Sequence, residues 1–120
     1  ICACLVGSEM CKETGTYLHQ GFVRITNNGN GYIGIGGGTE CNVSCSTVKL
    51  NIYLERSSGS EDFYSYQKWE NVDHNTNSLY FGKEIKVEKG YYYRLRGYHS
   101  CTKNGVTENG GSRTNGIYIG

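Results

Sequence analysis

Apolar and polar residues alternate along several short stretches of this chain, and this alternation is the feature that most limits its fold. The clearest stretch covers residues 47–56, where one face of a strand would carry Val48, Leu50, Ile52 and Leu54. No segment longer than a few residues repeats apolar side chains at helical spacing. The pattern therefore predicts half-buried β-strands rather than helices.

Further strands are predicted wherever the alternation recurs. These are residues 17–26, 32–36, 63–69, 79–87, 91–98 and 117–119. Asn-Gly steps, a Ser-Gly-rich stretch at residues 57–60 and a polar stretch at 73–77 are predicted to connect them. About seven or eight short strands favour one antiparallel β-sandwich, of immunoglobulin- or fibronectin-like or jelly-roll-like type, and an open barrel is the alternative. Its core is expected to include Trp69, Phe81, Ile85, Val87, Tyr91, Tyr93 and Leu95 as well.

The pattern divides the chain into an arm and a single domain. Residues 1–16 show no clear period and hold half of the cysteines, so they are interpreted as an N-terminal arm. Residues 17–120 would form the β-sandwich domain. Within it, Tyr93 is a candidate for the hydrogen bond of a tyrosine corner.

Charge and hydropathy exclude several classes of partner. The net charge is +1, and the charged residues are scattered along the chain, so neither nucleic-acid binding nor a polybasic membrane anchor is expected. The longest apolar run, residues 1–6, is far shorter than the ~20 residues that span a bilayer, so no membrane insertion is expected. The chain begins at Ile1 rather than Met, as expected for the processed form of an exported protein.

The cysteines are even in number, and they are interpreted as a disulfide framework. They are Cys2, Cys4, Cys11, Cys41, Cys45 and Cys101. In a small exported chain such a set normally forms disulfides. Zinc is the rival interpretation, but only the C-x3-C pair at Cys41 and Cys45 has the spacing of a zinc knuckle. All six cysteines are therefore predicted to be oxidised, with Cys41 or Cys45 joined to another region.

Three stretches carry a resemblance to a known family. They are the strand at residues 48–56, Trp69 with the polar residues 75–78, and the Tyr- and Arg-rich residues 90–99 followed by 104–108 and 114–119. From about residue 27 onward the chain resembles uncharacterised small secreted proteins of Gram-positive, clostridia-type bacteria. The resemblance implies export and an immunoglobulin- or fibronectin-like sandwich without catalytic residues. The cysteines depart from that pattern, and the arm is similar in architecture to subunits of disulfide-linked bacterial surface fibres.

No group of residues predicts catalysis or cofactor binding. The sequence from Gly29 to Gly34 matches G-x-G-x-x-G, but it is not followed by a helical pattern, which a nucleotide site needs. His99 and Cys101 would share a strand face without forming a dyad, and His19 and His74 lack an evident nucleophile. We therefore expect no enzyme activity, no cofactor and no bound metal.

Tyrosine is abundant, with 11 residues, and several tyrosines are predicted to point outward. The candidate binding surface comprises Tyr53, Tyr64, Tyr66, Tyr92, Tyr98, Arg94 and Arg96. Tyrosine suits binding surfaces because it supplies contact area at a low entropy cost. The alternative is that these tyrosines simply fill pleated sheet positions.

Two functions remain after these exclusions. The first is a non-enzymatic extracellular structural protein that self-associates into a surface assembly or filament, with residues 1–11 contacting another copy and Cys2 or Cys4 forming an intermolecular bridge. The second is a secreted monomeric module that binds a host protein or a glycan through its tyrosine-rich face. A secreted hydrolase or toxin ranks third, because no catalytic constellation is found.

Overall fold

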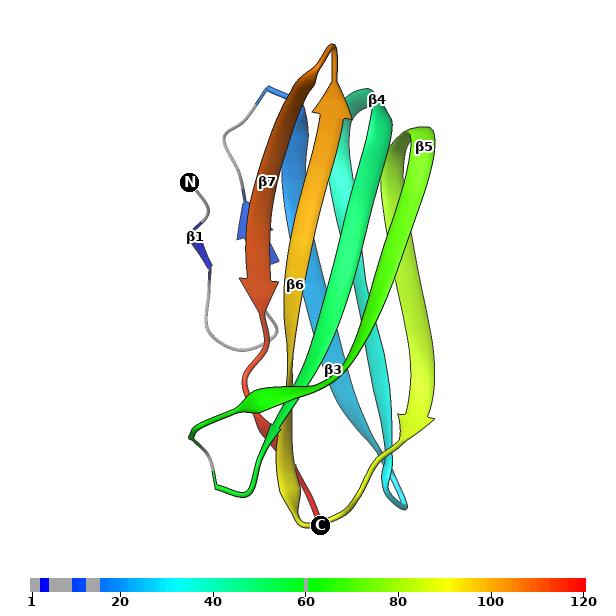
Figure 1. Ribbon diagram of the computed structural model, residues 1–120. Coiled ribbons are helices and arrows are strands. Elements are labelled where there is room, and N and C mark those ends of the chain that lie inside the picture. Colours follow the sequence, from blue (N-terminus) through cyan, green and yellow to red (C-terminus); the bar gives the residue numbers. More distant parts are fainter. Residues whose placement is uncertain (1–2, 5–9, 13–15, 60) are drawn as a thin grey trace.

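The computed structural model describes residues 3–4, 10–12, 16–59 and 61–120 and consists of antiparallel β-strands, without a helix in those residues (Figure 1). The strands are β1 (Ala3–Cys4), β2 (Met10–Lys12), β3 (Leu18–Gly29), β4 (Tyr32–Ser57), β5 (Tyr64–Lys86), β6 (Tyr91–Lys103), β7 (Val106–Arg113) and β8 (Ile117–Ile119). Within the described ranges, no helix is long and apolar enough to cross a membrane.

Hydrogen bonds join these strands into a single sheet. Its order is β1-β2-β3-β4-β6-β7, with β5 paired to β4 and β8 paired to β6. β4 is long because it belongs to two parts of the sheet: residues 32–41 pair with β3, and residues 47–57 pair with β6. β5 follows β4 through both parts, from Arg56↔Tyr64 to Tyr32↔Lys86.

The sheet folds over on itself where β4 and β5 turn back (Figure 1). The first limb contains β2, β3, residues 32–40 of β4 and residues 78–86 of β5. The second limb contains residues 45–57 of β4, residues 64–76 of β5, β6, β7 and β8. We call residues 41–44 and the facing residue 77 the corner, because the β4–β5 register shifts between Glu40 and Cys45. Asn75, beside the corner, has a φ of 54°.

The hydrophobic core lies between the two limbs, as the alternating pattern requires. Val23, Ile33 and Ile35 of the first limb cluster with Leu50, Ile52, Leu54, Tyr93 and Leu95 of the second. Gly37 permits the close approach, because a Cβ there would lie 2.6 Å from the carbonyl oxygen of Phe22 and 3.3 Å from Cδ1 of Ile52. All the core residues expected from the sequence are either buried in this core or packed against it, apart from Val48, which is buried in a second cluster with Leu18.

The all-β, antiparallel prediction is confirmed, and so are several local details. Asn30-Gly31 and Asn104-Gly105 form hairpin turns, with both residues of each pair at positive φ. The phenol of Tyr93 donates a hydrogen bond to the carbonyl oxygen of Glu88 at 2.6 Å, which is the expected corner contact. The polar residues 73–77 were expected to connect strands, but β5 continues through them. The sandwich type and strand number stay predictions.

Candidate functional site

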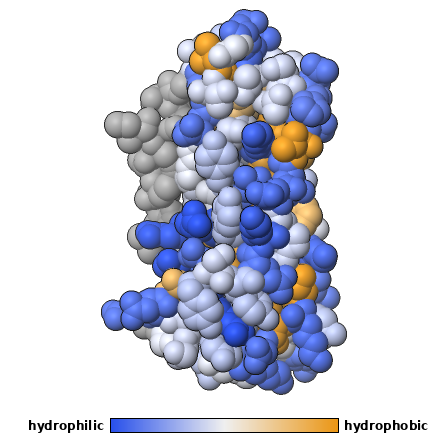
Figure 2. Space-filling view, viewed as in Figure 1, coloured by the Kyte–Doolittle hydropathy of each residue, from blue (hydrophilic) through white to orange (hydrophobic). Residues whose placement is uncertain are grey.

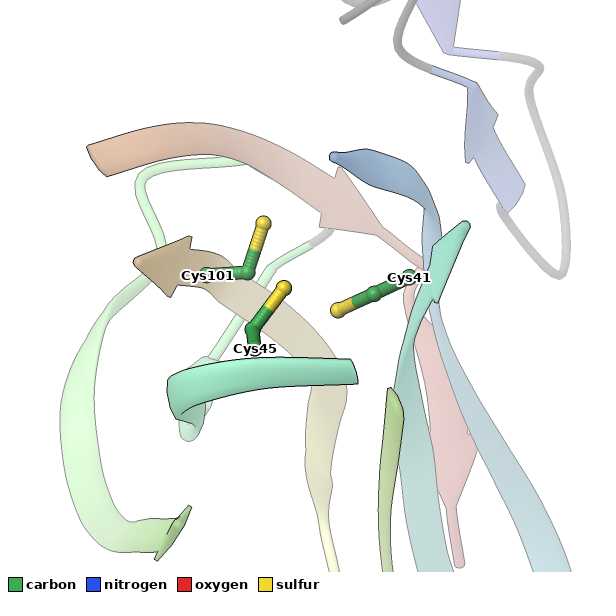
Figure 3. A group of neighbouring side chains, drawn as sticks. All are labelled: Cys41, Cys45 and Cys101. Carbon is green, nitrogen blue, oxygen red and sulfur yellow. The ribbon is translucent and has the colours of Figure 1, made fainter. Parts of the chain in front are cut away.

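Three cysteines meet at the corner. Cys41 and Cys45 lie on either side of the turn in β4, and Cys101 lies on β6, which pairs with β4 through Val48↔Cys101. Their three sulfur atoms all lie within 4.8 Å of one another (Figure 3). We call this group the cysteine cluster. All three residues are free thiols in this structure.

The cysteine cluster has apolar surroundings, and its three cysteines are buried to different extents. Cys45 and Cys101 are buried with Leu18 and Val48, whereas Cys41 is half-buried. Burial, followed by the neighbouring Cys45, raises the pKa of Cys41 to about 12, and burial also raises the pKa of Cys101. The thiols of Cys41 and Cys101 are therefore mostly protonated near neutral pH, and because the thiolate is the nucleophile, they react slowly there.

The cysteine cluster suits disulfide chemistry better than a closed zinc site. A structural zinc site takes four ligands, and among the described residues this group supplies three. Any two of the thiols can form a bridge after a small movement, because a disulfide needs a sulfur–sulfur bond of about 2.05 Å. The predicted link from Cys41 or Cys45 to another region has a nearby partner in Cys101, although the oxidation state of the six cysteines stays a prediction.

The remaining cysteines lie in residues 1–11. Cys2 is outside the described residues. Cys4 and Cys11 are directly opposite each other as Cα partners of β1 and β2, and their side chains are outside the described part. The contact of residues 1–11 with another copy, predicted from the sequence, therefore concerns a segment of which only short backbone stretches are described. Those stretches pair onto β3 through β2.

Five of the seven residues of the candidate binding surface share the outer face of the second limb. Tyr53 of β4 pairs with Arg96 of β6, and its ring lies 4.6 Å from the Arg96 guanidinium carbon. Tyr92, Arg94 and Tyr98 occupy the alternate, half-buried positions of β6 on the same side as Arg96. The ring of Tyr92 packs against that of Tyr118, at 5.1 Å between centroids. The structure thus brings these five residues together.

Glu55 organises this face. One oxygen of its carboxylate accepts a hydrogen bond from Nε of Arg94 at 2.8 Å, and the other accepts one from Nε of Arg96 at 3.2 Å. Only 10% of the Glu55 side chain is exposed, so both arginines are held by a nearly buried acid. Arg94 also stacks on Phe63 at 4.2 Å. Both guanidinium groups are therefore largely committed to contacts within the chain.

The other two candidate residues, Tyr64 and Tyr66, belong to a different cluster. Arg56 lies between the rings of Tyr66 and Tyr91, 4.2 Å from each centroid, and donates a hydrogen bond from Nε to the hydroxyl oxygen of Tyr64 at 3.0 Å. Tyr66 packs edge-on against the core residue Tyr93. These two tyrosines therefore serve packing around Arg56 rather than the outer face.

A shallow trough lies on the outer face of β6 and β7. Its floor is glycine-rich, and its lining residues are Arg96, Gly97, Tyr98, Asn109, Gly110, Gly111, Ser112 and Arg113. Arg113 is directly opposite Arg96 in the β6–β7 register, so two cations border the trough. The trough suits an extended anionic or hydroxyl-rich ligand.

His99 lies inside the molecule in a chain of hydroxyl groups. The Thr39 hydroxyl donates to the carbonyl oxygen of Lys49 at 2.9 Å, so it accepts from Nδ1 of His99 at 2.8 Å. Nε2 is then the acceptor for the hydroxyl of Ser112 at 2.6 Å. Both hydroxyl residues and His99 are buried, and burial lowers the pKa of His99 to about 4. The His99–Ser112 hydrogen bond is thus a buried contact that joins β6 to β7.

Several residues that matter for these sites were not singled out from the sequence. Glu55 is one of them, and the β4–β6 register places it opposite Arg94. Glu108 accepts hydrogen bonds from the backbone nitrogens of Thr16, Tyr17 and Leu18, and these bonds lower its pKa. It thereby fastens the start of β3 to β7 beside the cysteine cluster. No local pattern could reveal these partners, because all of them are distant in sequence.

Comparison with known proteins adds a family without an assigned activity. A model of a family of unknown function, DUF6147, matches residues 9–117. No curated protein and no solved structure matches the chain. The match begins well before residue 27, where the resemblance was expected to start, and it includes Cys11 and the cysteine cluster. Secretion and a bacterial origin stay predictions.

Proposed function

Because the chain belongs to DUF6147, a family of unknown function, we propose its role from its own structure: it is a non-enzymatic, self-associating structural subunit of a disulfide-stabilised extracellular assembly. The single observation that carries this proposal is the outer edge of β5. β5 is 23 residues long and, among the described strands, it pairs only with β4. A long strand with one unpaired side is a template for pairing with another chain.

The side chains of β5 support its use as a contact. Tyr64, Val72 and Tyr80 are large exposed hydrophobic residues on this strand. Figure 2 shows hydrophobic side chains among hydrophilic ones along the margin where β5 lies in Figure 1. Charged residues are interspersed with them and limit indiscriminate aggregation, as edge strands require. A mixed edge of this kind favours one specific partner.

The strand is self-complementary around Trp69. When two copies of β5 pair antiparallel with Trp69 opposite Trp69, Lys68 of each copy is opposite Glu70 of the other. Within one chain the Lys68 ammonium lies 4.0 Å from the Glu70 carboxylate, and both side chains are more than half exposed, at 62% and 59%, so a second chain can exchange this weak internal pair for two pairs across the contact. Opposite charges at directly opposed positions contribute about 0.2–1 kcal/mol per pair.

The remaining parts of the proposal follow from composition and layering. Six cysteines in 120 residues are typical of an oxidising, extracellular compartment. We take the two facing limbs as the two layers of a β-sandwich, an architecture that many cell-surface domains share. Pairing through β5 is isologous and closes at a dimer, so extension into a filament needs a second contact, which we assign to the arm.

The experiment compares sedimentation of three full-length chains under reducing conditions at low salt. The unmodified chain is expected to dimerise with rising concentration. Glu70→Lys places like charges opposite each other twice in the dimer and should weaken association about ten-fold. The matched control, Lys68→Glu with Glu70→Lys, restores opposite charges and should dimerise like the unmodified chain. A monomer at all concentrations, or equal association of the two variants, would contradict the proposal.

The trough on β6 and β7 supports one alternative, the monomeric binding module. Its glycine-rich floor and the bordering Arg113 would receive an acidic glycan or protein segment, whereas Arg96 is already paired with Glu55. Titration with a sulfated or uronic-acid polysaccharide separates the two functions. Binding that is lost in Arg113→Ala, together with a monomeric chain, would favour the module over the structural subunit.

A further inference from the structure

The cysteines fall into two groups of three. The cysteine cluster contains Cys41, Cys45 and Cys101, and residues 1–11 contain the others. Disulfides consume cysteines in pairs, so neither group can be fully oxidised by itself. A fully oxidised chain must therefore contain a bridge that leaves the cysteine cluster, either to residues 1–11 or to another molecule.

We propose that Cys45 and Cys101 form an internal disulfide and that Cys41 is the covalent acceptor for Cys2 of a second copy. The inference rests on the proposed function, and it deepens that function by naming the two residues of the joint. The occupant of the site is thus the extreme N-terminal segment of another subunit.

Burial separates the roles of the three cluster cysteines. Cys45 and Cys101 are 1% and 0% exposed, so another chain cannot reach their sulfur atoms. Cys101 lies on β6 opposite Val48, three residues after Cys45, and the bend at the corner brings the sulfur atoms of Cys45 and Cys101 within 4.8 Å of each other. Cys41 is half-buried and forms part of a surface hollow with His19, Glu40, Asn77, Ser78 and Tyr80. Glu40 is held there by Tyr80 and Gln20. The cysteine clusters of two subunits therefore cannot be bridged to each other through their buried cysteines. An extended segment of another subunit can reach Cys41.

The register of the first limb argues against a bridge from Cys4 or Cys11 to Cys41 within one chain. Cys11 is opposite Gly21, and Gly21 is opposite Thr39, two residues before Cys41. Two strand spacings and two residue rises place the Cα atoms of Cys11 and Cys41 about 12 Å apart along the sheet. Cys4 lies one strand farther away. Cysteines whose Cα atoms are more than about 7 Å apart cannot be bridged without backbone movement.

The same register gives Cys4 and Cys11 a simpler partner. As directly opposed residues of an antiparallel pair, they have Cα atoms about 4.5–5.5 Å apart, within the range of a disulfide. Their bridge leaves Cys2 as the unpaired cysteine of its group, just as the internal bridge leaves Cys41 in the cluster. One free cysteine of each group then remains for the joint.

The chemistry is two successive oxidations by a small disulfide such as oxidised glutathione. In each, two protein thiols lose two protons and two electrons and form one sulfur–sulfur bond, while the oxidant is reduced to two thiols. The internal bridge forms first within the cluster. That bridge removes two thiols beside Cys41, that of Cys45, which raises the pKa of Cys41, and that of Cys101, which lowers it, while burial, the largest cause of the raised pKa, remains. Cys41 is then the one free thiol of the cluster for the bond to the arriving segment.

The test uses the full chain, oxidised in a glutathione buffer as an equal mixture of ¹⁴N- and ¹⁵N-labelled protein. Trypsin without reduction releases residues 1–12, 25–49 and 97–103 as the cysteine-containing peptides. We expect peptide 25–49 to be joined to 97–103 and to 1–12, with the link to 1–12 containing both isotopes. Cys41→Ser and Cys2→Ser should each remove the mixed-isotope link and the covalent ladder on a non-reducing gel. Cys41→Ser should keep the 25–49 to 97–103 link.

Each other outcome overturns the inference in a recognisable way. A link between two 1–12 peptides alone would refute Cys41 as acceptor but leave self-association intact. A link from 1–12 to 25–49 with a single isotope would show an intrachain bridge. One equivalent of zinc by elemental analysis, with three thiols protected from alkylation, would show that the cysteine cluster is a metal site. Non-covalent dimerisation of reduced chains, measured separately, reports on the proposed function alone.

Discussion

His99 should make the protein lose stability between pH 7 and pH 5, and the size of the loss follows from its burial. The side chain is 1% exposed, and burial lowers its pKa from 6.5 to about 4. Between these two values the unfolded chain binds a proton that the folded chain does not. Stability therefore rises with pH in this window and is lost as the pH falls.

The expected loss is about 2 kcal/mol on going from pH 7 to pH 5, and the limit at lower pH is about 3 kcal/mol, since each pKa unit corresponds to about 1.4 kcal/mol. The described contacts of the imidazole are the hydroxyls of Thr39 and Ser112 and the backbone at Gly21 and Gly97, so no carboxylate there offsets the charge. Glu40 and Glu108, whose pKa values are lowered in the folded chain, also lose stability as the pH falls towards 5, so the contribution of His99 is read from the difference between the unmodified chain and a His99 variant.

Urea unfolding at pH 5, 6 and 7, followed by the fluorescence of the single tryptophan, Trp69, measures this loss. His99→Gln should be less stable at pH 7 and should show a smaller slope across the window, because glutamine does not titrate. His74→Gln, a change of the same kind at an exposed position, is the matched control. An equal slope in the unmodified chain and in His99→Gln would refute the assignment of the pH dependence to this residue.

Three substitutions test the packing in the same urea assay at neutral pH. Ile52→Ala should cost about 2–5 kcal/mol because it opens a cavity between the limbs, and a smaller loss would contradict the core position. Gly21→Ala should cost about 1–3 kcal/mol, because its Cβ would lie 2.1 Å from Cγ of His99, whereas Gly59→Ala meets no atom within 4 Å and should be neutral. Tyr93→Phe should cost about 1–2 kcal/mol through its lost hydrogen bond, and an unchanged midpoint would exclude the corner contact.

The inner faces of the strands could be predicted from the sequence because alternation reports which side of a strand is buried. Leu50, Ile52 and Leu95 follow this rule, and each is fully buried. The Asn-Gly turns at residues 30–31 and 104–105 are equally local, since they depend on residues that tolerate positive φ. Asn109-Gly110 has the same composition but lies within β7, because pairing with β6 overrides the turn preference.

The corner and the cysteine cluster could not be predicted, because both depend on long-range pairing. Residues 73–77 are polar and mostly exposed, and an exposed strand corner has the same composition as a loop. Cys101 reaches Cys41 and Cys45 only through the β4–β6 register. Similarly, the sequence does not distinguish between the tyrosines predicted to point outward. In the structure, Tyr64 and Tyr66 pack around Arg56 rather than beside Tyr53.

The length of β4 has a mechanical consequence for any polymer built from this subunit. The strands run along the 47 Å axis of the molecule, and β4 passes through both limbs without a break (Figure 1). Tension that enters at Cys41 pulls along residues 32–41 of β4, so it loads their hydrogen bonds to β3 and β5 in shear, where many bonds share the force. Pulling across the strands would instead open the bonds one after another. Because Cys41 lies at the corner, the fold should resist force best when it is pulled along its strands.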